Sequence, residues 1–201
     1  NHPNSLMAVD VCSSFGGMKM DWEAADIWLG SVQKCLSMPA GLGYLIINEK
    51  AVEKAKSVRR NIPDWRKLDV MIDQMKKYQI FETPNSLAIG CLAILMRTFD
   101  LEKTDKETRR KADFLFDCDL NWEPLFKGTE WRSLTTPHFL VDDADKWHKQ
   151  ALEHGFQLGP MFGEYAKKGF RIANFPSHTY EIMERLVQSL KPLSTKELAS
   201  S

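Results

Sequence analysis

The stretch DIWLGSVQKCLSMPAGLGYLII, residues 26–47, is the most informative part of the chain for its fold. It holds two apolar runs, 27–29 and 42–47, joined by a polar turn that ends in Gln33 and Lys34 and by a loop rich in proline and glycine. Short apolar runs between turn residues are typical of buried strands. We therefore expect two strands here, with a lysine at the mouth of the turn between them. Taken alone, such a lysine is more often a solvated turn residue.

Composition is that of an ordinary globular protein. Of the 201 residues 43% are hydrophobic and 27% are charged, and Lys plus Arg equals Asp plus Glu at 27 each. The absence of a basic excess argues against a nucleic-acid partner. No apolar run approaches the length of a membrane span, so we expect no membrane partner either.

The cysteines and histidines form no metal motif. The four cysteines are scattered without a CxxC pair, and no HExxH is present, so we expect no metal site. Scattered cysteines favour free thiols in a reducing compartment, and we predict a cytoplasmic protein.

Upstream and downstream of this stretch, short strands alternate with helices. We expect strands at 6–11, 27–29 and 42–47 and a helix at 49–59 capped by Asn48. This alternation predicts an α/β layer with a mainly parallel sheet. Thr83 at the cap and Pro84 at the first helical position then predict a helix that runs to about Phe99.

The pattern changes near residue 103, where we place a domain boundary. Thr104 and Glu107 form a predicted capping box, which starts a helix at Asp105. Further helices and strands follow, and few strands among helices favour a small α+β domain with an antiparallel sheet. The helices are expected at 105–118, 144–154 and 180–190, and the strands at 133–140 and 170–174.

Several motifs together carry a resemblance to a known family. They are VDVCSSFGG from Val9, Gln33-Lys34 followed by Pro39, Gly41 and Gly43, ETPNSLAIG from Glu82, and GFRIAN from Gly169. Together they resemble the class V pyridoxal-phosphate (PLP) aminotransferases over residues 6–190, and within them the phosphoserine aminotransferases most.

The resemblance implies the C-terminal part of a fold-type-I enzyme. Residues 1–103 would be the C-terminal portion of the large PLP-binding domain, including a helix at the subunit interface. Residues 104–201 would be the small α+β domain. The chain also begins abruptly, with an apolar strand almost at once, and we expect a fragment that lacks the upstream half of the large domain.

The family pattern assigns roles to five cofactor residues. Lys34 matches the Schiff-base lysine, which also moves a proton during catalysis. Asp10 matches the acid against the pyridine nitrogen, and Cys12 stands where a residue packs on the ring. Gln33 matches a phosphate-binding neighbour. Thr83 matches a threonine that reaches the cofactor phosphate of the partner subunit, which implies a homodimer.

Arg171 matches the arginine that binds the substrate's α-carboxylate, a contact that suits the guanidinium fork. The substrates implied are an amino acid and a 2-oxo acid, with phosphoserine and 2-oxoglutarate preferred. Two departures are visible. Ile80 replaces the tyrosine of glyoxylate-specific members. The His-Arg pair that serves the substrate phosphate is absent, and only Lys167 and Lys168 are cationic there.

Alternatives stay open at this point. A serine– or alanine–glyoxylate aminotransferase is the second candidate within the class. Cysteine desulfurases and kynureninase-like enzymes share much of the lysine segment, although Cys118 falls in a predicted helix rather than in a mobile loop. The alternative from another class is a truncated chain that folds without binding a cofactor.

Overall fold

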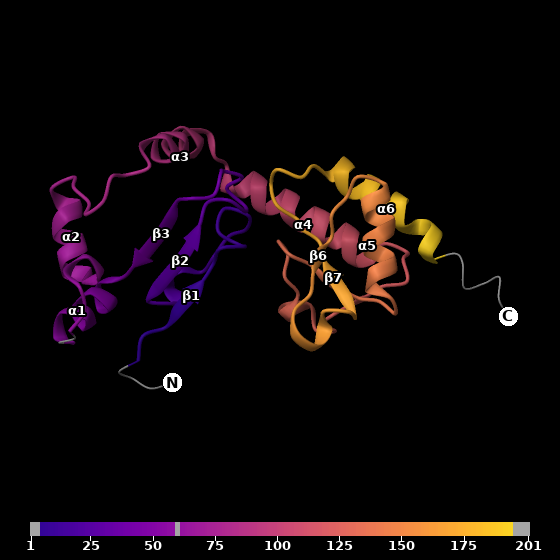
Figure 1. Ribbon diagram of the computed structural model, residues 1–201, viewed down its shortest axis with the longest axis horizontal. Helices are drawn as coiled ribbons and strands as arrows, with labels where there is room; N and C mark the ends of the chain where they lie inside the picture. Colours follow the sequence, from indigo (N-terminus) through magenta and orange to yellow (C-terminus); the bar gives the residue numbers. More distant parts are fainter. Residues whose placement is uncertain (1–4, 59–60, 195–201) are drawn as a thin grey trace. The chain divides into compact units, whose positions relative to one another are not determined.

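The computed structural model describes residues 5–58 and 61–194, which form two compact units (Figure 1). The first unit consists of the described residues among Asn1–Phe15, Met20–Lys34 and Met38–Phe99. The second consists of Gly16–Lys19, Cys35–Ser37 and the chain from Asp100 onward. Each unit is described by itself. Among the described helices, none has the length and apolar character that crossing a membrane requires.

A three-stranded sheet in the order β1-β2-β3 organises the first unit (Figure 1). Strand β1 (Ala8–Asp10) runs parallel to β2 (Ile27–Ser31), and β3 (Gly43–Ile47) runs antiparallel to β2. The α/β class is confirmed, but this sheet is mixed rather than mainly parallel. The connection from β2 to β3 contains no helix, and a chain that returns without a crossover pairs antiparallel.

Tyr44 ties β3 to β2 and to the loop after β1. It stands opposite Gly30 in the register, and a Cβ at Gly30 would collide with the tyrosine ring. The ring also packs on Phe15 in a tilted arrangement, at 4.4 Å between centroids. The buried core beside it is small and consists of Val11, Ala25 and Trp28.

Four helical segments complete this unit, after a single 3-10 turn at Trp22–Ala24. Helix α1 (Glu49–Ser57) is capped as predicted, because Asn48 Oδ1 accepts a hydrogen bond from the Ala51 amide at 2.9 Å. A 3-10 turn at Asp64–Arg66 precedes α2 (Leu68–Lys76), and α3 (Ser86–Thr98) ends the unit.

The predicted start of α3 at Thr83 and Pro84 is wrong by two residues. Asn85 is the cap, and its side chain accepts a hydrogen bond from the Ala88 amide at 3.0 Å. Asparagine caps at least as well as threonine, so the helix starts at the later site and Pro84 stays outside it.

The second unit is an α+β fold with an antiparallel sheet in the order β4-β5-β7-β6, as predicted. Its short strands are β4 (Glu123–Pro124), β5 (His138–Leu140), β6 (Gly159–Pro160) and β7 (Gly169–Arg171). Its α-helices are α4 (Leu101–Asp117), α5 (Ala144–Glu153) and α6 (Tyr180–Ser194), and 3-10 turns lie at Thr129–Trp131 and Gly163–Tyr165.

Aromatic side chains fill the core of this unit. Phe139 of β5 and Phe170 of β7 stand opposite each other and are fully buried. Trp122 stacks on Phe139 at 4.4 Å, and Trp147 of α5 packs on Phe170 at 5.7 Å. Since side chains alternate along a strand, the neighbouring residues His138 and Arg171 belong to the opposite face of the sheet.

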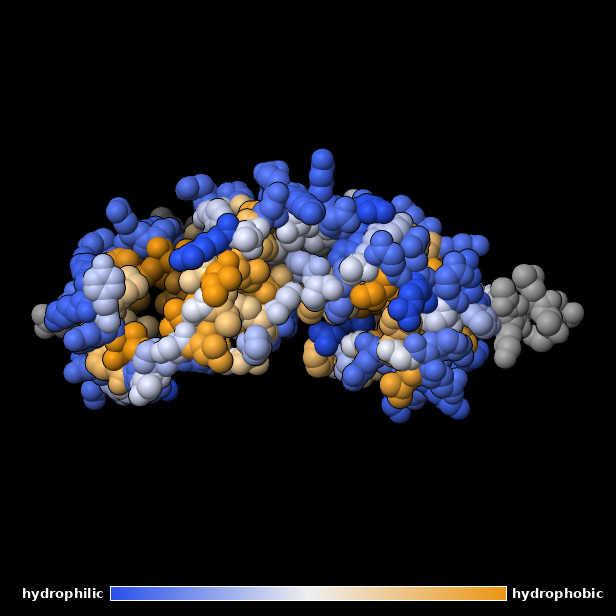
Figure 2. Space-filling model, turned by 90° about the horizontal axis from the view of Figure 1, so that it is seen from above, coloured by the Kyte–Doolittle hydropathy of each residue, from blue (hydrophilic) through white to orange (hydrophobic). Residues whose placement is uncertain are grey.

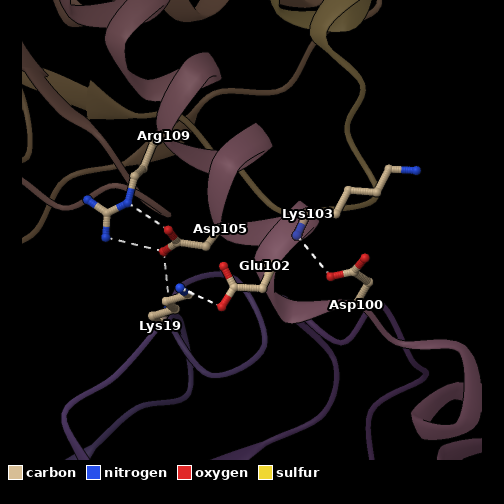
Figure 3. A network of polar contacts seen from close by, with 6 residues as sticks. All are labelled: Lys19, Asp100, Glu102, Lys103, Asp105 and Arg109. Atoms are coloured by element: carbon tan, nitrogen blue, oxygen red, sulfur yellow. Dashed lines mark hydrogen bonds and ion pairs between the residues drawn. The ribbon is translucent and has the colours of Figure 1, made fainter.

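Helix α4 begins four residues earlier than the capping box predicts. Asp100 is the cap, and its side chain accepts a hydrogen bond from the Lys103 amide at 3.0 Å (Figure 3). The Thr104 hydroxyl donates to the Asp100 carbonyl at 2.7 Å. Asp105 is buried and accepts a hydrogen bond from the Lys19 amide at 2.9 Å and an ion pair from Arg109 at 2.8 Å. This network fastens segment Gly16–Lys19 to the first turns of α4.

Candidate active site

The predicted cofactor residues lie where β1 and β2 end. Parallel neighbours carry their carboxyl ends at the same edge of a sheet, and that edge is the usual place for a ligand in an α/β layer. Asp10 is the last residue of β1 and Ser31 the last of β2. The residues that follow the two strands therefore meet, although they are distant in the sequence.

Lys34 reaches across to the loop after β1. Its Nζ donates a hydrogen bond to Ser13 Oγ at 2.8 Å, and both residues are partly buried. Ser31 Oγ donates to Cys12 Sγ at 3.5 Å in the same place. A primary amine is thus presented among hydroxyl groups at the end of the sheet.

Asp10 stays ionised beside this amine. Hydrogen bonds from the Cys12 thiol and from the Cys12 amide, the latter at 2.8 Å, lower the pKa of the Asp10 carboxyl below its usual value of 3.8. The positive charge of Lys34 lowers it further. The carboxylate is therefore anionic at neutral pH and able to stabilise a protonated nitrogen.

The loop that carries these groups is held on both sides. The Val11 amide donates to the Leu29 carbonyl at 2.8 Å, and Tyr44 Oη donates to the Val11 carbonyl at 3.4 Å. Turn bonds from the Ser14 and Phe15 amides to the Val11 carbonyl close the loop. The position of Cys12 and Ser13 is thus set by β2 and β3 as well as by β1.

Gln33 and Thr83 are exposed. Gln33 directly precedes Lys34, and Thr83 lies two residues before the cap of α3. Within residues 5–58 and 61–194, neither side chain has a hydrogen-bonded protein partner. The roles predicted for them remain predictions.

Arg171 is the last residue of β7 in the second unit and is partly buried. Its Nε donates to the Pro160 carbonyl at 2.9 Å, and its guanidinium carbon lies 4.6 Å from the centre of the Phe162 ring. Gly159 stands opposite it in β6 and adds no side chain to crowd it. These contacts orient the guanidinium, and the hydrogen bond uses Nε, so the terminal nitrogens can bind a carboxylate.

His138 stands opposite Arg171 on the other neighbouring strand, β5. Burial lowers the pKa of His138 below its usual value of 6.5, and the Arg171 charge contributes in the same direction. The imidazole is therefore neutral at physiological pH and does not compete with Arg171 for an anion. Lys167 and Lys168, the cations proposed for a substrate phosphate, are exposed.

Sequence reasoning missed Ser13 as the partner of Lys34. The serine stands within VDVCSSFGG, but nothing in the pattern shows that it rather than Ser14 faces the lysine. Metal-binding residues are a separate matter, and in the described part of the chain no three His, Cys, Asp or Glu residues lie close enough to hold an ion.

Comparisons with known proteins place this arrangement in context. No family model matches the chain. A phosphoserine aminotransferase from Rhodococcus opacus is 30% identical over 150 residues, which make up 71% of this chain and 37% of that protein. The chain thus spans between about a quarter and little more than a third of the length of the curated relatives it matches.

Solved structures give the same likeness over more of the chain. A phosphoserine aminotransferase from Cytophaga hutchinsonii superposes with a TM-score of 0.84 at 30% identity and covers 94% of this chain and 55% of that one. An alanine–glyoxylate aminotransferase from Nostoc reaches a TM-score of 0.80 at 21% identity, with 94% and 54% covered, and shows the shared fold alone.

Proposed function

We propose that this chain, which is homologous to the C-terminal part of the phosphoserine aminotransferases in the class V PLP-dependent family, supplies the catalytic lysine and the substrate-binding arginine of an aminotransferase. The reaction would pass the amino group of phosphoserine to 2-oxoglutarate. The contact of Lys34 with Ser13 beside the ionised Asp10 carries this proposal, because it puts an amine and an acid at the ligand-binding edge of the sheet.

The residues present fit pyridoxal phosphate. When bound, this cofactor supplies an electron sink for the bonds at the substrate's Cα. The Asp10 carboxylate would hold the ring nitrogen in its protonated form, with Cys12 beside it. Ser13, Ser31 and Gln33 are neutral donors of the kind that bind a phosphate, and Thr83 would serve the partner subunit's cofactor.

Lys34 would carry the proton of the reaction. Its amine is free of carboxylate ion pairs within the described residues, and the hydroxyl of Ser13 holds it in place. A positioned amine can take a proton from the substrate's Cα and return it elsewhere. Arg171 would bind the α-carboxylate that the amino acid and the 2-oxo acid share, and so serve both halves of the reaction.

Substrate choice follows from the relatives and from the cations near Arg171. The phosphoserine reading follows the relatives' names and the two lysines before β7, which could contact a substrate phosphate. Alanine– or serine–glyoxylate transamination stays the second candidate, as the shared lysine segment left it, and the Nostoc alanine–glyoxylate aminotransferase shares the fold only. Desulfurase chemistry is disfavoured, because burial raises the pKa of the Cys118 thiol to about 11 and so suppresses its thiolate.

A homodimer would cover the apolar surface of the first unit. Helix α3 has no buried residue, and Leu87 and Ile94 are 79% and 66% exposed. Figure 2 shows hydrophobic side chains gathered on the surface of this unit. Patches of this kind mark interaction sites. A second copy on α3 agrees with the role proposed for Thr83 at the head of this helix.

We assign the two units to the two domains expected from the family. Residues 1–103 would be the C-terminal portion of the large cofactor-binding domain, and residues 104–201 the small domain. The cytoplasm is the proposed compartment, because all four cysteines are free thiols and a reducing environment keeps them so.

Visible absorption after addition of PLP tests the proposal. We expect a band that borohydride fixes covalently to the wild-type chain, that is absent from Lys34→Ala and that persists in Lys54→Ala, a lysine of α1. Mass spectrometry should then find the reduced cofactor on Lys34. A folded wild-type chain without such a band, also when joined to upstream sequence of a relative, would show that it is no aminotransferase.

A further inference from the structure

Lys111 of α4 is a cation inside the second unit. The residue is 2% exposed, and burial lowers the pKa of its ammonium group below the usual 10.5. Within residues 5–58 and 61–194 it forms no ion pair. Burying a charge without a counter-ion has an unfavourable desolvation free energy, which hydrogen bonds to the charged group must offset.

Both hydrogen bonds of this ammonium group go to one segment. Nζ donates to the Phe175 carbonyl at 2.9 Å and to the His178 carbonyl at 2.7 Å. The segment Ile172–His178 directly follows Arg171 and joins β7 to α6. Lys111 thus donates to two backbone carbonyls that are three residues apart in the connection between β7 and α6.

The segment is compact by itself, which makes the lysine contact effective. The His178 amide donates to the Phe175 carbonyl at 3.0 Å, and His178 Nδ1 contacts the Ala173 carbonyl at 2.7 Å. The two rings also stack at 6.1 Å. Because the segment is held together internally, the two hydrogen bonds from Lys111 fix the position of the segment as a whole.

Asn174 fastens the same segment a second time. The side chain is fully buried, and Nδ2 donates to the carbonyls of Thr108 at 2.9 Å and Leu134 at 2.8 Å. Thr108 lies one turn before Lys111 on α4. Helix α4 therefore contacts the segment through two groups, the backbone carbonyl of Thr108 and the ammonium group of Lys111.

We propose that Lys111 is a positioning residue for Arg171: it holds segment Ile172–His178 on α4 and so fixes the strand end from which Arg171 binds the substrate carboxylate. This inference deepens the proposed function and rests on it for the role of Arg171. Methionine at position 111 would fill the volume but remove the hydrogen bonds that the ammonium group donates to the Phe175 and His178 carbonyls.

Substrate titrations of the PLP-loaded full chain test the inference. In Lys111→Met the apparent dissociation constants for both the amino acid and the 2-oxo acid should rise roughly tenfold, as expected for a lost positioning contact. The maximal rate and the cofactor spectrum should change less than about twofold, because Lys34 and Asp10 are untouched. Lys106→Met, an exposed lysine of the same helix, should match the wild type.

A fall of the maximal rate without a change of affinity, or an equal effect of Lys106→Met, would overturn the inference. If Lys111→Met does not fold, Lys111→Gln takes its place, because it keeps a donor at lower cost. Thermal unfolding followed by circular dichroism establishes which variant is folded.

Amide hydrogen exchange separates this inference from the proposed function. In Lys111→Met exchange should accelerate about tenfold in residues 172–179, while β5 and α5 keep the wild-type rate. Equal acceleration throughout the second unit would mean general destabilisation and would refute the positioning role. The exchange measurement needs no cofactor. A chain that shows no PLP band would therefore contradict the proposed function and leave the test of Lys111 intact.

Discussion

Nζ of Lys34 and Oγ of Ser13 lie 2.8 Å apart, although 21 positions of the chain separate the two residues. The contact joins the turn after β2 to the loop after β1. Its geometry follows from the parallel pairing of these strands, in which Asp10 stands beside Leu29. A small set of strand pairs therefore brings the amine, the hydroxyl and the Asp10 carboxylate together.

Removal of the Ser13 hydroxyl should weaken cofactor attachment. Hydrogen bonds to charged groups contribute about 1.5–3 kcal/mol, and the partial exposure of Lys34 reduces this, so we expect Ser13→Ala to slow formation of the borohydride-fixable band by roughly fivefold. Stopped-flow absorbance after PLP addition measures the rate. Ser14→Ala is the matched control and should keep the wild-type rate; equal rates in all three proteins would show that the hydroxyl does not position the lysine.

Asp26 should stabilise the first unit against acid. Hydrogen bonds from the Asn48 side chain and the Met7 amide, together with Lys50, lower the pKa of Asp26 from 3.8 to about 2. Because the folded pKa is depressed, the stabilisation is complete above the unfolded value of 3.8 and is lost as the pH falls towards 2. Asp26→Asn should lower the unfolding midpoint at pH 6 and flatten its decline in that window.

Urea titrations between pH 2 and 6 give these midpoints. Asp21→Asn is a suitable control, since its side chain is exposed and only caps the 3-10 turn at Trp22–Ala24. A variant at position 26 that declines with pH as steeply as the wild type would contradict the assignment.

Phe162 should support substrate binding by Arg171. The ring lies 4.6 Å from the guanidinium carbon and is 72% exposed, so the cation–π contact is worth about 0.5–1 kcal/mol. Phe162→Leu should raise the KM for amino acid and 2-oxo acid about two- to fivefold and leave kcat unchanged, since the ring orients a binding group only. Tyr165→Leu, in the same loop, serves as control. A fall in kcat would place Phe162 in the chemical step instead.

The sequence predicts local features of this fold well. The apolar runs around Lys34 become β2 and β3, Asn48 caps α1, and the antiparallel sheet of the second unit follows from its short strands. The strand positions and the cap depend on residues close to one another in the chain, whereas the sheet pairs residues as far apart as His138 and Arg171. The α/β class and the family resemblance follow from local patterns of this kind.

Other features depend on contacts that no local pattern reveals. Thr83 and Thr104 both satisfy the rules for a cap, yet Asn85 caps α3 and Asp100 caps α4. More than one residue near each helix start can act as a cap, so the local pattern does not decide between them. The antiparallel β3, the Ser13 partner of Lys34 and the burial of Lys111 arise from pairing and packing between distant segments. Sequence patterns name the chemical groups of the site, and the tertiary fold decides their neighbours.

Ile94 should be essential for the proposed dimer. It is 66% exposed on α3 and lies two helical turns from Leu87, which is 79% exposed, so the two side chains share one face. An aspartate placed in an apolar interface loses its hydration without gaining a partner, and Ile94→Asp should weaken dimerisation roughly a hundredfold or more. Sedimentation velocity across a concentration series measures this. Asn61→Asp adds the same charge elsewhere on the first unit and should leave the dimer intact, because it spares α3. If wild type and Ile94→Asp sediment alike, α3 is not the dimer surface, and the role of Thr83 towards a partner's cofactor fails with it.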